Sequence, residues 1–350
     1  MGESPRSGNA QSSLVAIVVE RQYRVTVRKT QFLFTEIGYG RSMDVSVVVC
    51  TYAEERYPDF REAVGSVLAQ TYCSVEAVLV VDGNEAVFER VRADFADRED
   101  VVAHCNEKNS GLSYSRTKGV ELASGDVIAF LDDDAIARED WIEQLVAGYE
   151  RTDAIAVGGR MIPEWVAGKP DFLPEEFYWL IGANYEQRLD DWSEVRNTLG
   201  SNMSFRREVF EGVGGFDEQV GLTGDNQIQA EETELAMRMY DTFGKGMLYN
   251  PDAVVAHKVF EYRTEPAWLL RRAFWQGYSK RAVERLDVEG PASEEADFLG
   301  HLAFSSVPRR IAELVSEPER GKAKQLVMLV VLTACVGFGY LYGLVKSVIR

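Results

Sequence analysis

The stretch VSVVVC at Val45–Cys50 is a near-continuous run of apolar, mostly β-branched residues. Such a run is typical of a parallel strand that is buried on both of its faces. Two later stretches have the same character, VEAVLVV at Val75–Val81 and VIAFL at Val127–Leu131, and Val101–His104 is a shorter stretch of the same kind. We therefore predict that these four segments are strands of one sheet.

Segments with helical spacing separate the predicted strands. In Phe60–Gln70 the apolar side chains recur at positions that share one face of a helix, and Glu85–Phe95 and Ser113–Ala123 are expected to be helices as well. Alternation of strands and helices predicts an α/β fold with a mostly parallel sheet. In such a sheet, ligands bind beyond the carboxyl ends of the strands.

The polar residues that follow the strands are therefore the first candidates for a binding site. Thr51, Tyr52 and Glu54 follow the first strand, and Asp82 follows the second. The first strand is followed by neither a G-x-G-x-x-G nor a G-x-x-x-x-G-K-[ST] motif. This pattern argues against a dinucleotide-binding enzyme and against a P-loop enzyme.

Three adjacent aspartates, Asp132, Asp133 and Asp134, follow the strand at Val127–Leu131. Like charges about 4 Å apart repel each other by ~4 kcal/mol at an effective dielectric constant of 20, and a bound cation removes that cost. In an extended D-x-D, Asp132 and Asp134 point the same way and can share one Mg²⁺ or Mn²⁺ ion, while Asp133 points aside. The alternative is a solvated turn in which an aspartate caps the helix expected near Arg138–Trp141.

The C-terminal stretch Leu326–Val345 contains neither a charged residue nor a proline. A helix of this length spans about 30 Å, which is the thickness of the hydrocarbon core of a bilayer. We therefore predict one transmembrane helix over residues 325–347, with a buried core helix as the alternative. Basic residues are denser on its N-terminal side, which places the acidic domain on the cytoplasmic face of the cell membrane.

A second segment, Pro266–Leu286, mixes aromatic with basic side chains, among them Arg271, Arg272 and Trp275. As a helix it would have an apolar aromatic face and a basic face, which is the pattern of a helix in a membrane interface. An amphipathic helix packed on the domain is an equal alternative. We expect residues 261–320 to form amphipathic interfacial helices.

The composition narrows the class of protein further. The chain has 350 residues, a formal charge of −18 and ordinary globular hydrophobicity, which argues against disorder and against general nucleic-acid binding. An acidic chain with few lysines is typical of a halophilic source. Residues 1–42 are net basic, and we expect them to form a poorly ordered tail, with an extra strand or arm as the alternative.

Eight short motifs run in order along the chain. The first half contains C-T-Y-A-E, V-V-D-G-N, N-x-G-x-x-x-x-R and F-L-D-D-D. The second half contains Gly200–Phe210, Val213–Glu218, Ala230–Arg238 and Asn250–His257. From Met43 to His257, this ordered set resembles the inverting family 2 glycosyltransferases. The resemblance implies a GT-A fold, a single α/β domain that we expect at residues 43–260.

The resemblance also implies roles for the matching residues. Asp132 and Asp134 would hold the Mg²⁺ or Mn²⁺ ion, and His257 would be a further ligand or, equally, a core histidine. The residues that would bind the nucleotide sugar are Thr51, Tyr52, Glu54, Asp82, Asn109, Gly111, Arg116 and Asp133. On the acceptor side the candidates are Asn202, Arg206, Gly214 and Gly215, to which the basic aromatic segment adds Arg271, Arg272 and Trp275.

The acidic pair of the family reads Glu231-Glu232 here, although aspartate is usual at the second position. The resemblance implies that Glu232 is the general base, with Glu231 as the alternative. The base would take the proton from an acceptor hydroxyl, whose oxygen then attacks the anomeric carbon and inverts its configuration. In the structural alternative, these carboxylates only stabilise the N-terminus of a helix.

With the acidic composition and the apolar C-terminus, the resemblance extends to haloarchaeal members of the family that build dolichol-linked glycans for protein N-glycosylation. It implies UDP-glucuronate as the donor, a dolichyl-phosphate-linked saccharide as the acceptor and membrane lipid as a partner. The alternatives are a dolichyl-phosphate sugar synthase, another polysaccharide or lipid glycosyltransferase, and a membrane scaffold without activity.

Overall fold

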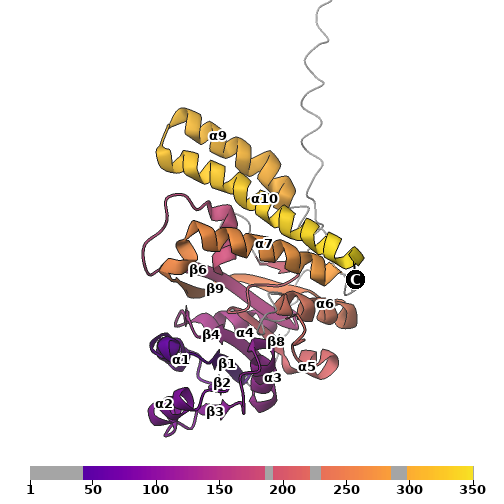
Figure 1. Ribbon diagram of the computed structural model, residues 1–350. Coiled ribbons are helices and arrows are strands. Elements are labelled where there is room, and N and C mark those ends of the chain that lie inside the picture. The colour runs from indigo at the N-terminus through magenta and orange to yellow at the C-terminus, as the bar shows by residue number, and fades with distance from the viewer. Residues whose placement is uncertain (1–41, 186–191, 221–229, 285–297, 350) are drawn as a thin grey trace, which may run out of the picture. The chain divides into compact units, whose positions relative to one another are not determined.

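The computed structural model describes residues 42–185, 192–220, 230–284 and 298–349 (Figure 1). The predicted tail, residues 1–42, lies outside the described residues except for Ser42. Within the described residues, nine strands form one sheet in the order β3-β2-β1-β4-β8-β6-β9-β5, and β7 pairs with β9. The strands are β1 (Val45–Thr51), β2 (Val75–Val81), β3 (Val101–Cys105), β4 (Val127–Asp132), β5 (Ala135–Ala137), β6 (Ala156–Trp165), β7 (Ser193–Val195), β8 (Met203–Arg206) and β9 (Met247–Val259).

The parallel part of the sheet confirms the prediction. β1 lies between β2 and β4, β2 pairs with β3, and all of these ladders are parallel. Beyond β4 the sheet is mixed, because β8 runs antiparallel to both β4 and β6, and β5 and β7 run antiparallel to β9. The sheet is therefore less uniformly parallel than its first four strands predict.

Helices cover both faces of the sheet. They are α1 (Tyr57–Leu68), α2 (Glu85–Phe95), α3 (Leu112–Leu122), α4 (Trp141–Arg151), α5 (Arg207–Val213) and α6 (Glu231–Phe243). Alternate residues of each strand point to opposite faces, so Val47 and Val49 pack with α1, α2 and α4, while Val48 packs with α3, α5 and α6. The expected helices after β1, β2 and β3 are confirmed with ends within a few residues.

A third apolar cluster joins the C-terminal helices to the domain. The short helix η2 (Glu175–Ile181) packs with α7 (Pro266–Val283), with a π-helical turn at Leu302–Ser306 and with α10 (Arg320–Ile349). The helix α9 (Val307–Ser316) precedes α10, and Figure 1 draws α9 and α10 beyond α7 on the side away from β1 to β3. Two short 3-10 helices, η1 (Glu54–Arg56) and η4 (Glu261–Thr264), follow β1 and β9.

Two glycines allow α7 and α10 to approach each other closely. A Cβ atom on Gly277 would overlap the carbonyl oxygen of Val336, and one on Gly339 would overlap that of Phe274. Gly343 likewise lies against the side chain of Arg281. The spacing Gly339-x-x-x-Gly343 thus serves helix packing within the chain. Because α7 is fixed in this way, it can close one side of the space above the sheet.

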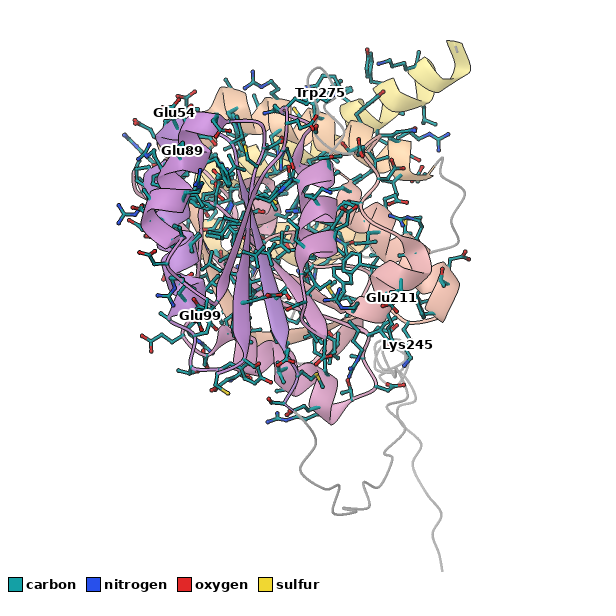
Figure 2. The ribbon with its side chains drawn as sticks, turned by 90° about the horizontal axis from the view of Figure 1, so that it is seen from below. Glu54, Glu89, Glu99, Glu211, Lys245 and Trp275 are labelled. Carbon is teal, nitrogen blue, oxygen red and sulfur yellow. The ribbon has the colours of Figure 1, made fainter. Side chains whose placement is uncertain are left out.

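The carboxyl ends of β1, β2 and β4 meet at one edge of the sheet. In Figure 2, Glu54, which follows β1, and Trp275 of α7 lie toward this edge, whereas Glu99, which precedes β3, and Lys245, which precedes β9, lie toward the opposite edge. The polar residues after the strands therefore face α7 across one space.

Candidate active site

The space at the carboxyl edge is an open cavity of about 900 Å³. Its floor is formed by the ends of β1, β2 and β4 and the residues that follow them, including Thr51, Asp82 and the three aspartates. Its wall is the first turn of α6, with Glu231 and Glu232. Its roof is formed by α7 and η4, which contribute Trp268, Arg272, Gln276, Tyr262 and Arg263.

The three aspartates of the floor point to three different partners. Asp133 accepts a hydrogen bond of 2.7 Å from the hydroxyl of Thr51. Asp132 accepts one of 3.0 Å from Arg116. Asp134 lies with Oδ1 3.1 Å from Nε2 of His257. None of the three caps the following helix, because the N-cap of α4 is Asp140, so the alternative of a simple capping turn is not what the structure shows.

Asp134 is the most strongly stabilised carboxylate of the floor. Its Oδ2 accepts a hydrogen bond of 2.8 Å from Arg263 and lies 3.5 Å from Nη1 of Arg56. Although burial alone would raise it, the contact with His257 and the two guanidinium groups hold the pKa of Asp134 well below its usual range. For Asp133, burial and the neighbouring Asp134 carboxylate raise the pKa to about 7.

Asp132, Asp134 and His257 form a group that fits a divalent metal ion. Each offers a ligand atom, and these atoms all lie within 4.8 Å of one another. Nδ1 of His257 lies 3.1 Å from the carbonyl oxygen of Ile181, which fixes the ring with Nε2 directed to Asp134. Two carboxylates and one imidazole form a donor set that could hold a divalent cation.

Arg116 joins the floor to the wall. This side chain is buried, and besides Asp132 it donates a hydrogen bond of 3.1 Å to Oε1 of Glu232. Gly200 leaves the space for this contact, since a Cβ atom there would overlap Glu232 and lie 2.7 Å from Arg116. One cation thus holds the aspartate of β4 and the acidic pair of α6 at a fixed separation.

The two glutamates of the wall differ in environment. Glu231 is 4% exposed, and burial together with the neighbouring Glu232 raises its pKa to about 8. The side chain of Glu232 is 22% exposed and reaches the cavity. Both stand in the first turn of α6, so the stabilisation of a helix N-terminus holds alongside any catalytic role.

Asp82 lies at the cavity, but its oxygens bind the chain itself. Oδ1 accepts hydrogen bonds of 2.9 Å from Asn106 and from the amide of Ser110, and Oδ2 accepts one of 2.8 Å from the amide of Gly111. The aspartate therefore shapes the loop that contains Asn109 and Gly111.

Of the other residues predicted for the nucleotide sugar, Tyr52 also lines the cavity and is 58% exposed. Glu54 is exposed and does not line the cavity. Its neighbour Glu55 lines the cavity instead.

The structure separates the residues predicted for the acceptor. Arg272 lines the roof, whereas Asn202, Arg206, Gly214, Gly215, Arg271 and Trp275 do not line the cavity. Asn202 is fully buried, and its amide bridges Trp141, Arg160 and Ala253.

Arg206 is paired with Val127, at the end of β4 that is opposite to Asp132, and Gly215 lies against Thr117 of α3. For these positions, placement in the fold favours structural roles. Arg271 is exposed on α7, and Trp275 packs edge to face with Phe274 and Tyr278.

The cavity is also lined by residues that the sequence did not predict, one from η1 and the others from the roof. Arg56 and Arg263 approach Asp134 from η1 and η4, and Trp268 and Gln276 line the cavity from α7. Arg263 stands 129 residues from Asp134, so no local pattern indicated the pair. The sequence signal that could have indicated these residues is the mixture of aromatic and basic side chains after His257.

A model of one protein family matches this chain. The description of the model is glycosyl transferase family 2, and the match covers residues 46–214. The chain is also 54% identical over 303 residues to the glucosyl-dolichyl phosphate glucuronosyltransferase of Haloferax volcanii, which covers 86% of this chain and 96% of that protein. The chain belongs to glycosyl transferase family 2. The family expected from the eight motifs is thus confirmed, and the chain is a glycosyltransferase.

Two further similar proteins have lower sequence identity to this chain. Glycosyltransferase AglE, also of Haloferax volcanii, is 28% identical over 255 residues, covering 69% of this chain and 75% of AglE. Among solved structures, mannosyltransferase PcManGT from Pyrobaculum calidifontis has a TM-score of 0.57 at 19% identity, covering 86% of this chain and 88% of that chain. At this identity the likeness concerns the fold, and it agrees with the GT-A fold expected for family 2.

Proposed function

We propose that this family 2 glycosyltransferase transfers glucuronate from UDP-glucuronate to a dolichyl-phosphate-linked saccharide, with inversion at the anomeric carbon, in protein N-glycosylation. The observation that carries the proposal is the identity of 54% to the Haloferax volcanii glucuronosyltransferase, which extends over 96% of that protein. The acidic composition of the chain agrees with a halophilic origin.

The floor is the proposed donor site. Thr51, Tyr52 and the loop held by Asp82 would bind the nucleotide, with Asn109 and Gly111 presented by that loop. Asp132, Asp134 and His257 would hold the divalent cation, with Asp133 beside them. When bound, such a cation neutralises the charge that develops on the departing diphosphate. PcManGT, which shares the fold, was solved with GDP-Man and Mn²⁺.

The wall is the proposed catalytic element. At pH 7 the raised pKa leaves Glu231 mostly protonated, so Glu232 is the better general base. Arg116 holds Glu232 toward the cavity, where it would take the proton from the acceptor hydroxyl. The hydroxyl oxygen then attacks the anomeric carbon from the face opposite the diphosphate, and the configuration inverts.

The roof is the proposed acceptor site. Arg272 is a partly exposed cation that lines the cavity, and its buried Nε has no hydrogen-bond partner among the described residues. It is suited to bind the phosphate of the acceptor lipid. Arg271 and Trp275 lie on the same helix outside the cavity, where they would meet the lipid rather than the sugar.

The membrane location also belongs to the proposal. Among the described residues, one helix segment, Arg320–Lys346 of α10, is long and apolar enough to cross a bilayer. Its basic N-terminal flank favours a catalytic domain on the cytoplasmic face. The attachment consists either of a single crossing, as the sequence predicts, or of a helix that lies along the bilayer.

An assay with defined substrates tests the reaction. The purified protein would be incubated with a panel of nucleotide sugars and with glucosyl-dolichyl phosphate or uncharged dolichyl phosphate, with and without EDTA. We expect transfer from UDP-glucuronate to the glucose-charged lipid alone, abolished by EDTA and restored by Mn²⁺ or Mg²⁺. Transfer from a different nucleotide sugar would refute the donor, and transfer to uncharged dolichyl phosphate would indicate a sugar synthase.

A further inference from the structure

The helix α9 has its apolar face outward. Phe304, in the π-helical turn before it, is 87% exposed, and Ile311 and Val315 of α9 are 47% and 77% exposed. On its inner side Arg310 is buried and forms an ion pair with the fully buried Glu176 of η2. A helix at a water-facing surface has the opposite arrangement, with its apolar residues inside.

The outer face of α10 is apolar in the same way. Val327, Val330, Phe338, Leu341 and Val345 are each more than half exposed, and they recur with helical spacing. From Val327 to Val345 this stripe is about 27 Å long. Figure 1 shows α9 and α10 side by side, and we call Phe304, Ile311, Val315 and the five residues of the stripe together the outer apolar surface. A monomer in water rarely exposes so many large apolar side chains together.

The inner face of α10 contacts the rest of the protein from Gln325 to Gly343. Near its start, Gln325 donates a hydrogen bond to the carbonyl oxygen of Asp171. In the middle, Leu329 and Leu332 are buried in the cluster with η2 and α7. Near its end, Gly339 and Gly343 pack on α7, as described above.

This continuous contact bears on how α10 meets a bilayer. If α10 crossed the hydrocarbon core, the segments packed on it would enter the core as well. Among these is α7 with the ion pair of Arg281 and Glu284, which lies beside α10 because Glu284 accepts a hydrogen bond of 2.8 Å from Tyr340. Charged groups are costly at that depth, and the cavity itself lies under α7.

Basic side chains stand at the borders of the outer apolar surface. Lys322 and Lys324, at the N-terminal end of α10, pair with Glu317 and Asp171 at the surface, Lys346 lies near its C-terminal end, and Arg271 is exposed on α7. This combination of an apolar surface with a cationic border is complementary to a bilayer with anionic headgroups. A second copy of this chain would present the same cations at the same border.

We propose that α9 and α10 lie in the plane of the membrane surface, with the outer apolar surface inserted into one leaflet and neither helix crossing the bilayer. This arrangement keeps both ends of α10 on the side of the catalytic domain. It sets the roof of the cavity directly under the headgroups, where a lipid-linked acceptor presents its sugar. The inference concerns attachment alone and stands whichever nucleotide sugar proves to be the donor.

The position of the C-terminus tests the proposal. The full chain with a C-terminal epitope tag would be reconstituted into sealed vesicles of phosphatidylcholine and phosphatidylglycerol, and the vesicles treated with protease from outside. We expect every molecule whose catalytic domain is digested to lose its tag as well. Protection of the tag in those molecules would overturn the proposal, because it requires a crossing.

Substitutions on α9 provide an independent test by vesicle flotation. Changing Phe304, Ile311 and Val315 together to Asp should lower the fraction that floats with vesicles by about tenfold or more, since all three would leave the lipid. The matched control is Val166→Asp, because Val166 is 56% exposed on the domain. Circular dichroism establishes that each variant is folded. Unchanged flotation of the folded triple variant, or a stable dimer that binds no vesicles, would contradict the proposal.

Discussion

The floor and the roof of the cavity differ in how far the chain itself satisfies their polar groups. On the floor, Asp82 accepts three hydrogen bonds from the loop beside it, and Asp134 is bound by His257 and Arg263. On the roof, Nε of Arg272 finds no hydrogen-bond partner within the described ranges, and Arg263 is a like charge nearby. Asp82 and Asp134 are thus hydrogen-bonded within the chain without a ligand, whereas Nε of Arg272 is not.

This difference indicates what each side of the cavity does. A floor whose groups are already bonded is held rigid before substrate arrives, which is what a site for a reacting diphosphate requires. A buried Nε–H without a hydrogen-bond partner, as in Arg272, destabilises the empty protein, and an anionic ligand that accepts from it relieves that cost. Loss of a floor residue should therefore weaken the fold as well as donor binding, whereas loss of a roof residue should weaken acceptor binding without weakening the fold.

The largest effect is expected at the proposed metal site. Asp134→Asn keeps the shape of the side chain but removes its charge, and we expect turnover to fall by about 10³-fold or more. Binding of Mn²⁺, followed by electron paramagnetic resonance, should be lost together with activity. The matched control is Glu99→Gln, an exposed carboxylate toward the opposite edge of the sheet. Full activity of Asp134→Asn would remove the floor from the mechanism.

The next effect separates the two glutamates of the wall. We expect Glu232→Gln to lower kcat by about 10²- to 10⁴-fold, since the general base is lost. Glu231→Gln should retain most of the activity at pH 7, because the pKa of about 8 leaves the native side chain largely protonated there. If the two variants exchanged these outcomes, Glu231 would be the base. Substantial activity of Glu232→Gln would indicate an acceptor that needs no base, such as a phosphate.

The raised pKa of Glu231 also predicts a dependence of stability on pH. The native state keeps a proton on Glu231 up to about pH 8, while the unfolded chain releases it near its ordinary value of 4.5. This contribution to stability is therefore complete below pH 4.5 and is lost as the pH rises through 8. In thermal unfolding at pH 6 and pH 9, Glu231→Gln should show a smaller difference in Tm than the unchanged protein. An equal difference in both proteins would contradict the raised pKa.

A moderate effect is expected from the floor at Asp82. Asp82→Asn cannot accept all the hydrogen bonds that the carboxylate receives from Asn106, Ser110 and Gly111. We expect the free energy of unfolding without ligand to fall by about 1–3 kcal/mol. Denaturation in urea at constant salt measures the change, with Asp153→Asn as an exposed control. Unchanged stability with weaker nucleotide binding would show that the floor does not differ from the roof.

The smallest effect on stability is expected from substitution of Arg272 in the roof. Unlike substitution of Asp82, it should not lower the stability of the protein without ligand. Burial and the nearby Arg263 lower the pKa of Arg272 to about 10, so the group is still charged at pH 7. Arg272→Gln should leave the Tm without ligand unchanged or raise it, because the buried Nε–H that has no hydrogen-bond partner is removed. The KM for the acceptor lipid should rise by about tenfold, since a charge-assisted hydrogen bond is lost. A lower Tm with an unchanged KM would make Arg272 a structural residue.

Local patterns predicted the first half of the fold well. The bounds of β2 and α2 agree with the predicted Val75–Val81 and Glu85–Phe95, because an apolar strand and an amphipathic helix carry their signals within a few residues. The position of β8 between β4 and β6 was not predictable in this way. That pairing joins Phe130 to Met203 and Met203 to Gly158, and it depends on contacts between segments far apart in the chain.

The residues of the candidate site also fall into two groups, those predicted from motifs and those that only the fold brings to the cavity. The aspartates, His257 and the acidic pair of α6 stand in motifs and were predicted from them. Asn202 and Arg206 also stand in a motif, but the fold places them in the core and at the far end of β8. Arg56 and Arg263 were missed because each reaches Asp134 only after the chain has folded.

By itself, the sequence determined the family, the parallel strands and the presence of an apolar C-terminal helix, because each depends on neighbouring residues or on an ordered set of motifs. Only the tertiary structure decided which polar groups have partners and which face of α9 and α10 is outward. The physical reason is that a hydrogen bond, an ion pair or a buried face belongs to two segments at once. The two segments come into contact only when the chain is folded.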